Sequence, residues 1–283
     1  MKIGVSSYSF SKYMRQTGCD VFEICNKAKE LGFEGIEFSG LPIFGENVDP
    51  IEVAGKVKAH CAELGLEIIS FCVGANFLAD DIEKEMATLR HCVDVAAALG
   101  APLMRHDVVY TLRQQPLYNY RSAIEEIAPL IRELTQYAKT KGVRTCTENH
   151  GYIFQAPERV EELILAVNDP NYGWLCDIGN FLCMDCDPAR SVAIAAPYAF
   201  HVHAKDFLLK APGKQMPGGF FMTTGGNYIR GTVIGHGVVP IENCVNALKK
   251  AGYDKWLSIE FEGPEENIDA LKNGLAYLQG VIG

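Results

Sequence analysis

The sequence has no long hydrophobic run, which argues against a membrane-spanning helix. None of its apolar stretches reaches the roughly 18 residues that such a helix needs. The stretch MKIGVSSYSF at the amino terminus has a lysine but no extended apolar core, so it does not resemble a secretory signal peptide. We therefore expect a cytoplasmic protein without a membrane partner, in which the 10 cysteines are reduced.

Basic residues are also scarce. The 26 Lys and Arg stand against 35 Asp and Glu, which gives a net charge of −9 and an isoelectric point of about 5.3. Proteins that bind nucleic acid through its phosphates need a positive surface. The charge balance therefore argues against a nucleic-acid partner.

Other signatures are missing too. No low-complexity tract or linker divides the 283 residues, and no G-x-G-x-x-G follows the first predicted strand, as a dinucleotide-binding open sheet would require. The pair Cys183 and Cys186 has no second pair and no neighbouring His, so it is weak ground for a zinc site. We expect this pair to be structural or incidental.

What the chain does contain is a repeated unit, a short apolar or β-branched run followed by an amphipathic helical stretch. Strands are predicted at 3–8, 34–38, 67–72, 102–106, 143–148, 173–177, 199–205 and 256–261, and a closing helix at 264–280. Eight such units, of roughly 35 residues each, are what a (β/α)8 barrel requires. We predict one TIM barrel domain over residues 1–283; a doubly wound open sheet is the alternative.

One crossover departs from this pattern. Residues 207–237 are rich in Gly and Pro and show no helical period. They predict a long loop after strand seven, on the face formed by the carboxyl ends of the strands.

Polar residues lie at the ends of four consecutive predicted strands, where the site of a barrel enzyme is built. They are Glu148, Asp177, His203 and Glu260. Taken singly, each has a plain reading: a solvated turn carboxylate, an Asx turn or a packed core histidine. Together, three carboxylates and one imidazole predict a site for one divalent cation. Mn²⁺ is preferred, and Mg²⁺, Co²⁺, Fe²⁺ or Zn²⁺ remain open.

Several stretches also carry a family resemblance. They are TENHG (147–151), CDIGNF (176–181), HVHAKD (201–206) and GYDKWLSIEFEG (252–263). These stretches resemble the sugar phosphate isomerase/epimerase group, whose members have a xylose isomerase-like TIM barrel. The group includes ketose 3-epimerases, inosose dehydratases and isomerases, dehydroshikimate dehydratases and, more distantly, metal-dependent AP endonucleases.

The resemblance places the metal ligands on Glu148, Asp177, His203 and Glu260. Where the family often has G-E-G before the last helix, this chain reads Gly235-His236-Gly237.

A metal-bound carbonyl acidifies the C–H bond beside it, and two carboxylates can then remove and return the proton. Glu148 and Glu260 are the expected pair, as the resemblance to 3-epimerases also implies. We predict a metal-dependent isomerase or epimerase of a sugar or sugar derivative, with a lyase of the dehydratase type as the alternative. A DNA-repair endonuclease is disfavoured by the acidic chain, and a binding protein without catalysis by the paired carboxylates.

The remaining site predictions concern a small carbohydrate substrate. Its candidate contacts, on or near the active face, are His150, Asn180, Lys205, Glu37, His106 and Arg230. Asn149, which strand alternation directs away from Glu148, is expected to brace the strand end. The resemblance leaves a homo-oligomer possible.

Overall fold

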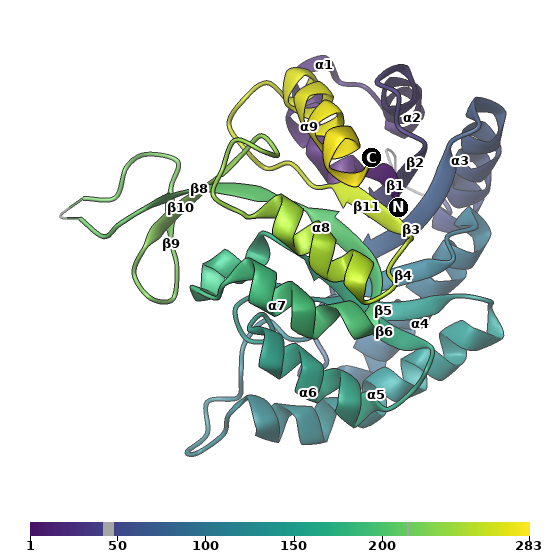
Figure 1. Cartoon of the computed structure of the whole chain (residues 1–283). Helices are drawn as coiled ribbons and strands as arrows, with labels where there is room; N and C mark the ends of the chain where they lie inside the picture. Colours follow the sequence, from purple (N-terminus) through teal and green to yellow (C-terminus); the bar gives the residue numbers. More distant parts are fainter. Residues whose placement is uncertain (42–47, 214) are drawn as a thin grey trace.

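Eight parallel strands close into a barrel in the computed structural model, which describes residues 1–41, 48–213 and 215–283 (Figure 1). The strands follow one another around the barrel in the order β1-β11-β7-β6-β5-β4-β3-β2. They are β1 (Lys2–Ser6), β2 (Gly35–Ser39), β3 (Glu67–Val73), β4 (Leu103–His106), β5 (Arg144–Glu148), β6 (Tyr172–Asp177), β7 (Ala199–Ala204) and β11 (Trp256–Ile259). The predicted (β/α)8 barrel is confirmed, and every predicted strand has an observed counterpart.

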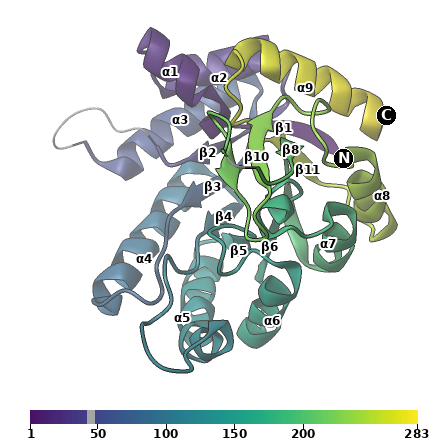
Figure 2. The same cartoon turned by 90° about the vertical axis from the view of Figure 1, so that its left-hand side faces the viewer.

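Helices surround the ring of strands (Figure 2). They are α1 (Ser11–Thr17), α2 (Val21–Glu30), α3 (Pro50–Leu64), α4 (Ile82–Leu99), α5 (Tyr120–Thr140), α6 (Pro157–Val167), α7 (Pro188–Ala195), α8 (Ile241–Lys250) and α9 (Asn267–Ile282), with 3₁₀ turns η1 (Ser7–Phe10), η2 (Asn180–Met184) and η3 (Ala196–Tyr198). Local sequence sets their ends. Asp20 and Glu23 form a reciprocal capping box at the start of α2, and Gly65 and Gly100 end α3 and α4 with positive φ. Among the described helices, none is both long and apolar enough to cross a bilayer.

The barrel strands separate an apolar outer layer from an interior in which polar side chains lie beside a small apolar cluster. On β7, Val202 and Ala204 join the main hydrophobic core, whereas His201 and His203 contact Glu37 of β2 across the barrel. Successive strand residues point to opposite faces, so this alternation follows from the pleat. The interior of the barrel therefore carries the functional groups, while the helix-facing layer supplies the packing.

The segment after β7, predicted as a long loop, contains short strands. The described part of 207–237, which leaves out residue 214, contains most of a three-stranded antiparallel sheet formed by β8 (Asp206–Lys210), β10 (Tyr228–Thr232) and β9 (Phe221–Met222). This sheet projects from the barrel in Figure 1 and lies in front of the strand ring in Figure 2. The Gly and Pro residues that excluded a helix are compatible with the turns between these short strands.

Two carboxylates, the exposed Asp185 and the buried Asp206, fasten this added sheet to the barrel. Asp185, just after η2, accepts hydrogen bonds from Thr223 and Asn227 in the turn between β9 and β10. Asp206 accepts four from the backbone N–H groups of Phe207, Gly235, Gly237 and Val239, at 2.8–3.1 Å. Asp206 thus fixes the turn 235–237, in which His236 is exposed.

We expect Asp206→Ala to destabilise the fold, because it leaves four backbone N–H groups without their acceptor. The loss should be about 2–4 kcal/mol in the free energy of unfolding, measured with urea. Asp80→Ala, at an exposed position, is the matched control and should cost less than about 0.5 kcal/mol. Equal effects of the two changes would show that Asp206 does not hold this turn.

Candidate metal centre and active site

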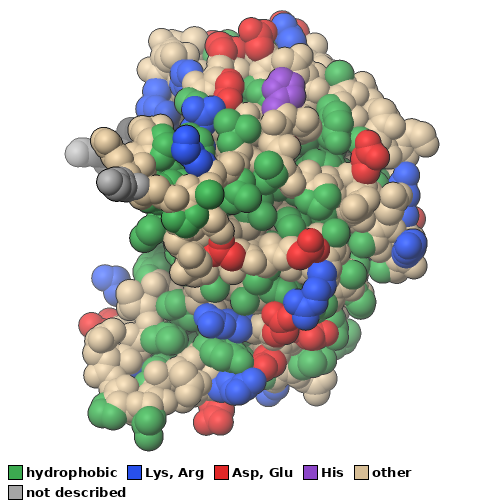
Figure 3. All heavy atoms as spheres, turned by 60° about the vertical axis from the view of Figure 1, so that its left-hand side comes forward, with side chains coloured by type: hydrophobic (Ala, Val, Ile, Leu, Met, Phe, Trp, Pro, Cys, Tyr) green, Lys and Arg blue, Asp and Glu red, His purple; other side chains and the backbone are tan. Residues whose placement is uncertain are grey.

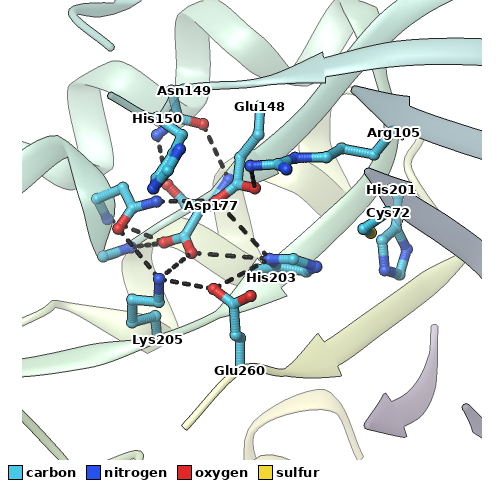
Figure 4. A network of polar contacts seen from close by, with 12 residues as sticks. Cys72, Arg105, Glu148, Asn149, His150, Asp177, His201, His203, Lys205 and Glu260 are labelled. Atoms are coloured by element: carbon cyan, nitrogen blue, oxygen red, sulfur yellow. Dashed lines mark hydrogen bonds and ion pairs between the residues drawn. The ribbon is translucent and has the colours of Figure 1, made fainter. Parts of the chain in front are cut away.

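Four neighbouring strands bring the predicted ligands together. Glu148 and Asp177 are the last residues of β5 and β6, His203 lies in β7, and Glu260 follows β11 directly. One ligand atom from each residue lies within 4.8 Å of all the others. Figure 4 shows the four side chains pointing toward one another. The structure therefore forms the cluster that the sequence predicts.

The geometry of the cluster fits one cation. His203 Nδ1 lies 3.5 Å from Glu260 Oε2, 3.8 Å from Asp177 Oδ2 and 3.9 Å from Glu148 Oε1. Two ligands of the same ion, each about 2.0–2.2 Å from it, can be up to about 4.4 Å apart. His203 Nδ1 is buried and has no hydrogen-bond partner among the described residues. A bound cation would use this atom.

Glu37, which lies deeper in the barrel than the four ligands, orients the ligand His203. Its Oε1 lies 2.7 Å from His203 Nε2, and its Oε2 lies 2.9 Å from His201 Nε2 and accepts a hydrogen bond from Ser70. A proton on His203 Nε2 leaves the Nδ1 lone pair facing the carboxylates, an arrangement common to metal-binding histidines. Glu37 was expected on the active face, but it is fully buried and does not line the cavity. Its position within β2 places it one layer deeper.

Glu148 is held by two partners. Arg105 Nη2 lies 2.6 Å from its Oε2, and Asn180 Nδ2 donates to its Oε1 at 2.9 Å. Burial raises the pKa of Glu148, and the Arg105 charge offsets only part of that rise. Asn180 also accepts from Lys205 Nζ at 3.2 Å, so it joins the two sides of the site.

Glu260 has the opposite electrostatic environment. Lys205 Nζ lies 2.6 Å from Glu260 Oε2 and 3.2 Å from Asp177 Oδ2. Burial alone would raise the pKa of Glu260, but Lys205 and His203 outweigh it, and the pKa is below its ordinary value. Two glutamates in one site thus have pKa values shifted in opposite directions, which is how enzymes separate proton donors from acceptors.

A cavity of about 170 Å³ opens over the cluster. It is lined by Tyr8, Ser39, Cys72, Arg105, Glu148, His150, His203, Lys205, Glu260 and Glu262. Of the six predicted substrate contacts, His150 and Lys205 line it. His150 is half exposed, its Nδ1 lies 3.1 Å from Asp107 Oδ1, and this hydrogen bond raises its pKa.

The other predicted contacts lie elsewhere. Asn180 is buried behind Glu148, and Arg230 stacks over Phe220 with Glu265 3.7 Å away. His106 was expected on the active face, but it is fully buried, with its ring between those of Phe77 and Tyr172. The reason is strand alternation: Arg105 points into the barrel, so the next residue points out.

The sequence reasoning did not assign roles to several lining residues. Arg105 precedes the last residue of β4 and pairs in register with Cys146 of β5; its place near the carboxyl end of a strand was the available signal. Tyr8 ends the strand predicted at 3–8, and Asp107 and Glu262 directly follow those predicted at 102–106 and 256–261, but no residue pattern marked them as part of the site. Asn149 behaves as expected, since it binds the backbone of Asp177 on the neighbouring strand.

The cysteine pair contributes no ligand to the metal cluster. Cys183 packs with Phe207 and Ile229 under the added sheet, and both Cys183 and Cys186 are free thiols. This agrees with a structural role for Cys183.

Comparisons with known proteins agree with this architecture. A family model described as "Xylose isomerase-like TIM barrel" matches residues 25–281, and no curated protein matches the chain. Among solved structures, the probable 3-DHS dehydratase AsbF from Bacillus anthracis is 19% identical, with a TM-score of 0.77 and 99% of each chain covered. The IOLI protein with a zinc atom is 16% identical, with a TM-score of 0.76 over 100% of this chain and 98% of that one. An L-ribulose 3-epimerase is 17% identical, with a TM-score of 0.73 over 99% and 94%. At these identities the likeness shows the fold.

The buried His106 predicts a specific pH dependence of stability. Burial lowers its pKa to about 4, against an ordinary value of about 6.5. Between these values the unfolded chain binds a proton that the folded protein does not, so stability falls as the pH is lowered from about 6.5 to about 4. His106→Phe keeps a ring of similar shape and removes this titration.

Urea unfolding at a series of pH values checks this. From pH 7.5 to 4.5 the wild type should lose about 2 kcal/mol more unfolding free energy than His106→Phe. Measurements between pH 7.5 and 8.5, where the histidine is neutral in both states, give the constant offset of the substitution. Parallel pH curves over the whole range would contradict a neutral, buried His106.

Proposed function

Because this chain belongs to the xylose isomerase-like TIM barrel family, we propose that it is a divalent-metal-dependent isomerase or epimerase of a sugar or sugar derivative. The observation that carries the proposal is the convergence of Glu148, Asp177, His203 and Glu260 under a polar cavity. The cavity has room for a small molecule, in keeping with a monosaccharide-sized substrate.

Charge balance supports the metal. Glu37, Glu148, Asp177 and Glu260 place four carboxylates in the interior, and the permanent cations in contact with them are Arg105 and Lys205. Asp107 and Glu262 share these two cations, so the carboxylates outnumber the permanent cations when His203 is neutral, and a divalent cation would reduce this excess of negative charge. We propose Mn²⁺ first, with Mg²⁺, Co²⁺, Fe²⁺ or Zn²⁺ as alternatives, since oxygen-rich sites with one imidazole accept each of these ions. The similar IOLI structure holds zinc.

A bound cation would polarise a substrate carbonyl and acidify the adjacent C–H bond. Glu260, whose pKa is low, is ionised and would accept the proton from that carbon. Glu148, whose pKa is high, can hold a proton and return one to the substrate. Arg105 and Asn180 fix the Glu148 carboxylate, and the Lys205 ammonium would stabilise negative charge that develops on a substrate oxygen.

A dehydratase activity on the same site is the second candidate. It is favoured by the pair His150 and Asp107 at the cavity. Loss of a β-hydroxyl needs a proton donor for the departing oxygen, and a histidine with a raised pKa beside a carboxylate can supply it.

The remaining expectations stay proposals. On the face shown in Figure 3, acidic and basic side chains are interspersed rather than gathered by sign. With the net charge of −9, this supports a small-molecule substrate over a nucleic acid. We also propose a cytoplasmic protein; a homo-oligomer is compatible with the family.

Proton NMR in D₂O tests the proposed chemistry. With Mn²⁺ present, a panel of ketoses, inososes and keto acids should contain a substrate whose C–H beside the carbonyl exchanges for deuterium. Glu148→Gln and Glu260→Gln should each slow that exchange at least 100-fold, within the usual range of about 10²–10⁴ for a lost acid or base. Glu125→Gln, on the exposed face of α5, should leave the rate unchanged. Intact exchange in both site variants would refute the two-carboxylate mechanism.

The same spectra separate the two candidate reactions. An epimerase or isomerase gives deuterated sugar with every hydroxyl retained, and His150→Gln leaves some exchange in place. A dehydratase gives an unsaturated product or its tautomer, and His150→Gln should reduce its formation about 100-fold because the proton donor is gone. Product formation at the wild-type rate in His150→Gln would rule out that role for the residue.

A further inference from the structure

A second cavity lies at the opposite end of the barrel, where the strands begin. Its volume is about 290 Å³. Most of its walls come from the first residues of β1, β4, β5 and β11 and from β7; the lining residues are Lys2, Ile69, Pro102, Leu103, Arg144, Phe200, His201, Asp254, Lys255 and Trp256. None of the residues that line the cavity over the metal cluster belongs to it. It is therefore a separate site.

A bulge in β7 places Phe200 in the apolar wall of this cavity. The pairing of β6 with β7 shifts so that Trp174 faces Ala199 and Leu175 faces His201, which leaves Phe200 as an extra residue. The Phe200 ring packs against the interior cluster that contains Leu103. A side chain at Gly173 would meet this ring at 2.6 Å, so the glycine makes room for it.

Two cations without an ion-pair partner among the described residues lie beside the Phe200 ring. The Arg144 guanidinium lies 3.3 Å from the centre of the Phe200 ring, and Lys255 Nζ lies 5.4 Å from it. Among the described residues, neither has a carboxylate within ion-pair distance, whereas Lys2 is paired with Glu67 at 2.9 Å. Burial lowers the pKa of both Arg144 and Lys255; Arg144 lowers that of Lys255 further, and Asp254, which also lines the cavity, offsets only part of this. An anion would relieve this repulsion.

His201 adds a buried polar atom that lacks a hydrogen-bond partner among the described residues. It lines the cavity and is 1% exposed, and its Nδ1 has no hydrogen-bond partner in the described part of the chain. Nε2 faces Glu37, so Nδ1 is the free position. Buried polar atoms are almost always paired, by protein, water or ligand.

We propose that this cavity binds a small organic anion with a flat apolar body, of the aromatic carboxylate class. The carboxylate pairs with Arg144 and Lys255, since guanidinium and carboxylate match in shape and charge. The ring lies against Ile69, Leu103 and Trp256, which supply the apolar lining typical of small-molecule pockets.

Tryptophan fluorescence offers a direct test, with benzoate as the probe. The chain has 2 Trp: Trp256 lines the cavity, and Trp174 is fully buried with its Nε1 bonded to Asn149. Benzoate should give a saturable change in emission below about 10 mM, and the neutral analogue benzamide should bind at least about tenfold more weakly. Trp256→Phe should abolish the signal but not the binding, measured by calorimetry.

Variants identify the site. Arg144→Gln and Lys255→Gln should each weaken benzoate binding at least about tenfold, since each removes one charge that faces the anion. Lys56→Gln, which removes a charge from exposed α3, is the control and should bind as the wild type does. Lys255 is exposed, so its variant tests the site even if Arg144→Gln unfolds.

Three results would overturn the proposal: no saturation below about 10 mM, equal affinity for benzamide, or unchanged affinity in Lys255→Gln. A change of oligomeric state in Arg144→Gln, seen by sedimentation without any effect on benzoate binding, would instead make this end a contact between copies. None of these measurements uses the catalytic reaction, so they stand apart from the proposed activity.

Discussion

The burial of carboxylates in one end of a barrel is the constraint on which the rest of the site depends. Removing a carboxylate from water costs several kcal/mol, and neighbouring carboxylates raise the cost further. Glu37, Glu148 and Asp177 are almost fully buried, and Glu260 is close to them. The interior can be stable only if positive charge enters it, and the protein supplies part of that charge through Arg105 and Lys205.

The partners that hold Glu148 and Glu260 explain why the two glutamates are proposed to have different chemical roles. Arg105 and Asn180 hold Glu148 from one side, and Lys205 holds Glu260 from the other. Glu37 lies one layer deeper and orients His203. Each group with a proposed chemical role is therefore fixed by a partner that does not itself take part in proton transfer, which is how a site keeps its geometry before the substrate binds.

The two ends of the barrel contrast in character. The carboxyl ends of the strands carry carboxylates in excess, whereas the amino ends form an apolar cavity beside Arg144 and Lys255, two cations with no ion pair in the described part of the chain. His201 and Glu37 lie between the two, since His201 lines the lower cavity and Glu37 joins it to His203. The two ends of one barrel thus differ in the ligands they can bind. The alternation of side chains along the strands, together with one bulge in β7, produces both ends.

Much of the fold and of the cluster could be predicted from the sequence. Strict alternation of strand and helix leaves few architectures, and polar residues at equivalent strand ends must converge in a closed barrel. How deep a strand residue lies in the barrel could not be predicted, because this depends on the register between neighbouring strands. Glu37 and His106 were both expected on the active face, and the first proved deeper and the second turned outward. The sheet β8-β10-β9 was also missed, since its short strands pair only with one another and carry no clear period.

Anomalous diffraction from a crystal grown with Mn²⁺ would show whether the four side chains bind one metal ion. We expect one strong manganese peak per chain, bonded to His203 Nδ1 and to oxygens of Glu148, Asp177 and Glu260, and absent in a crystal of Asp177→Asn. A peak that lacks contact with His203 Nδ1, or no peak at saturating Mn²⁺ with Lys205 still in contact with Glu260 and Asp177, would contradict it.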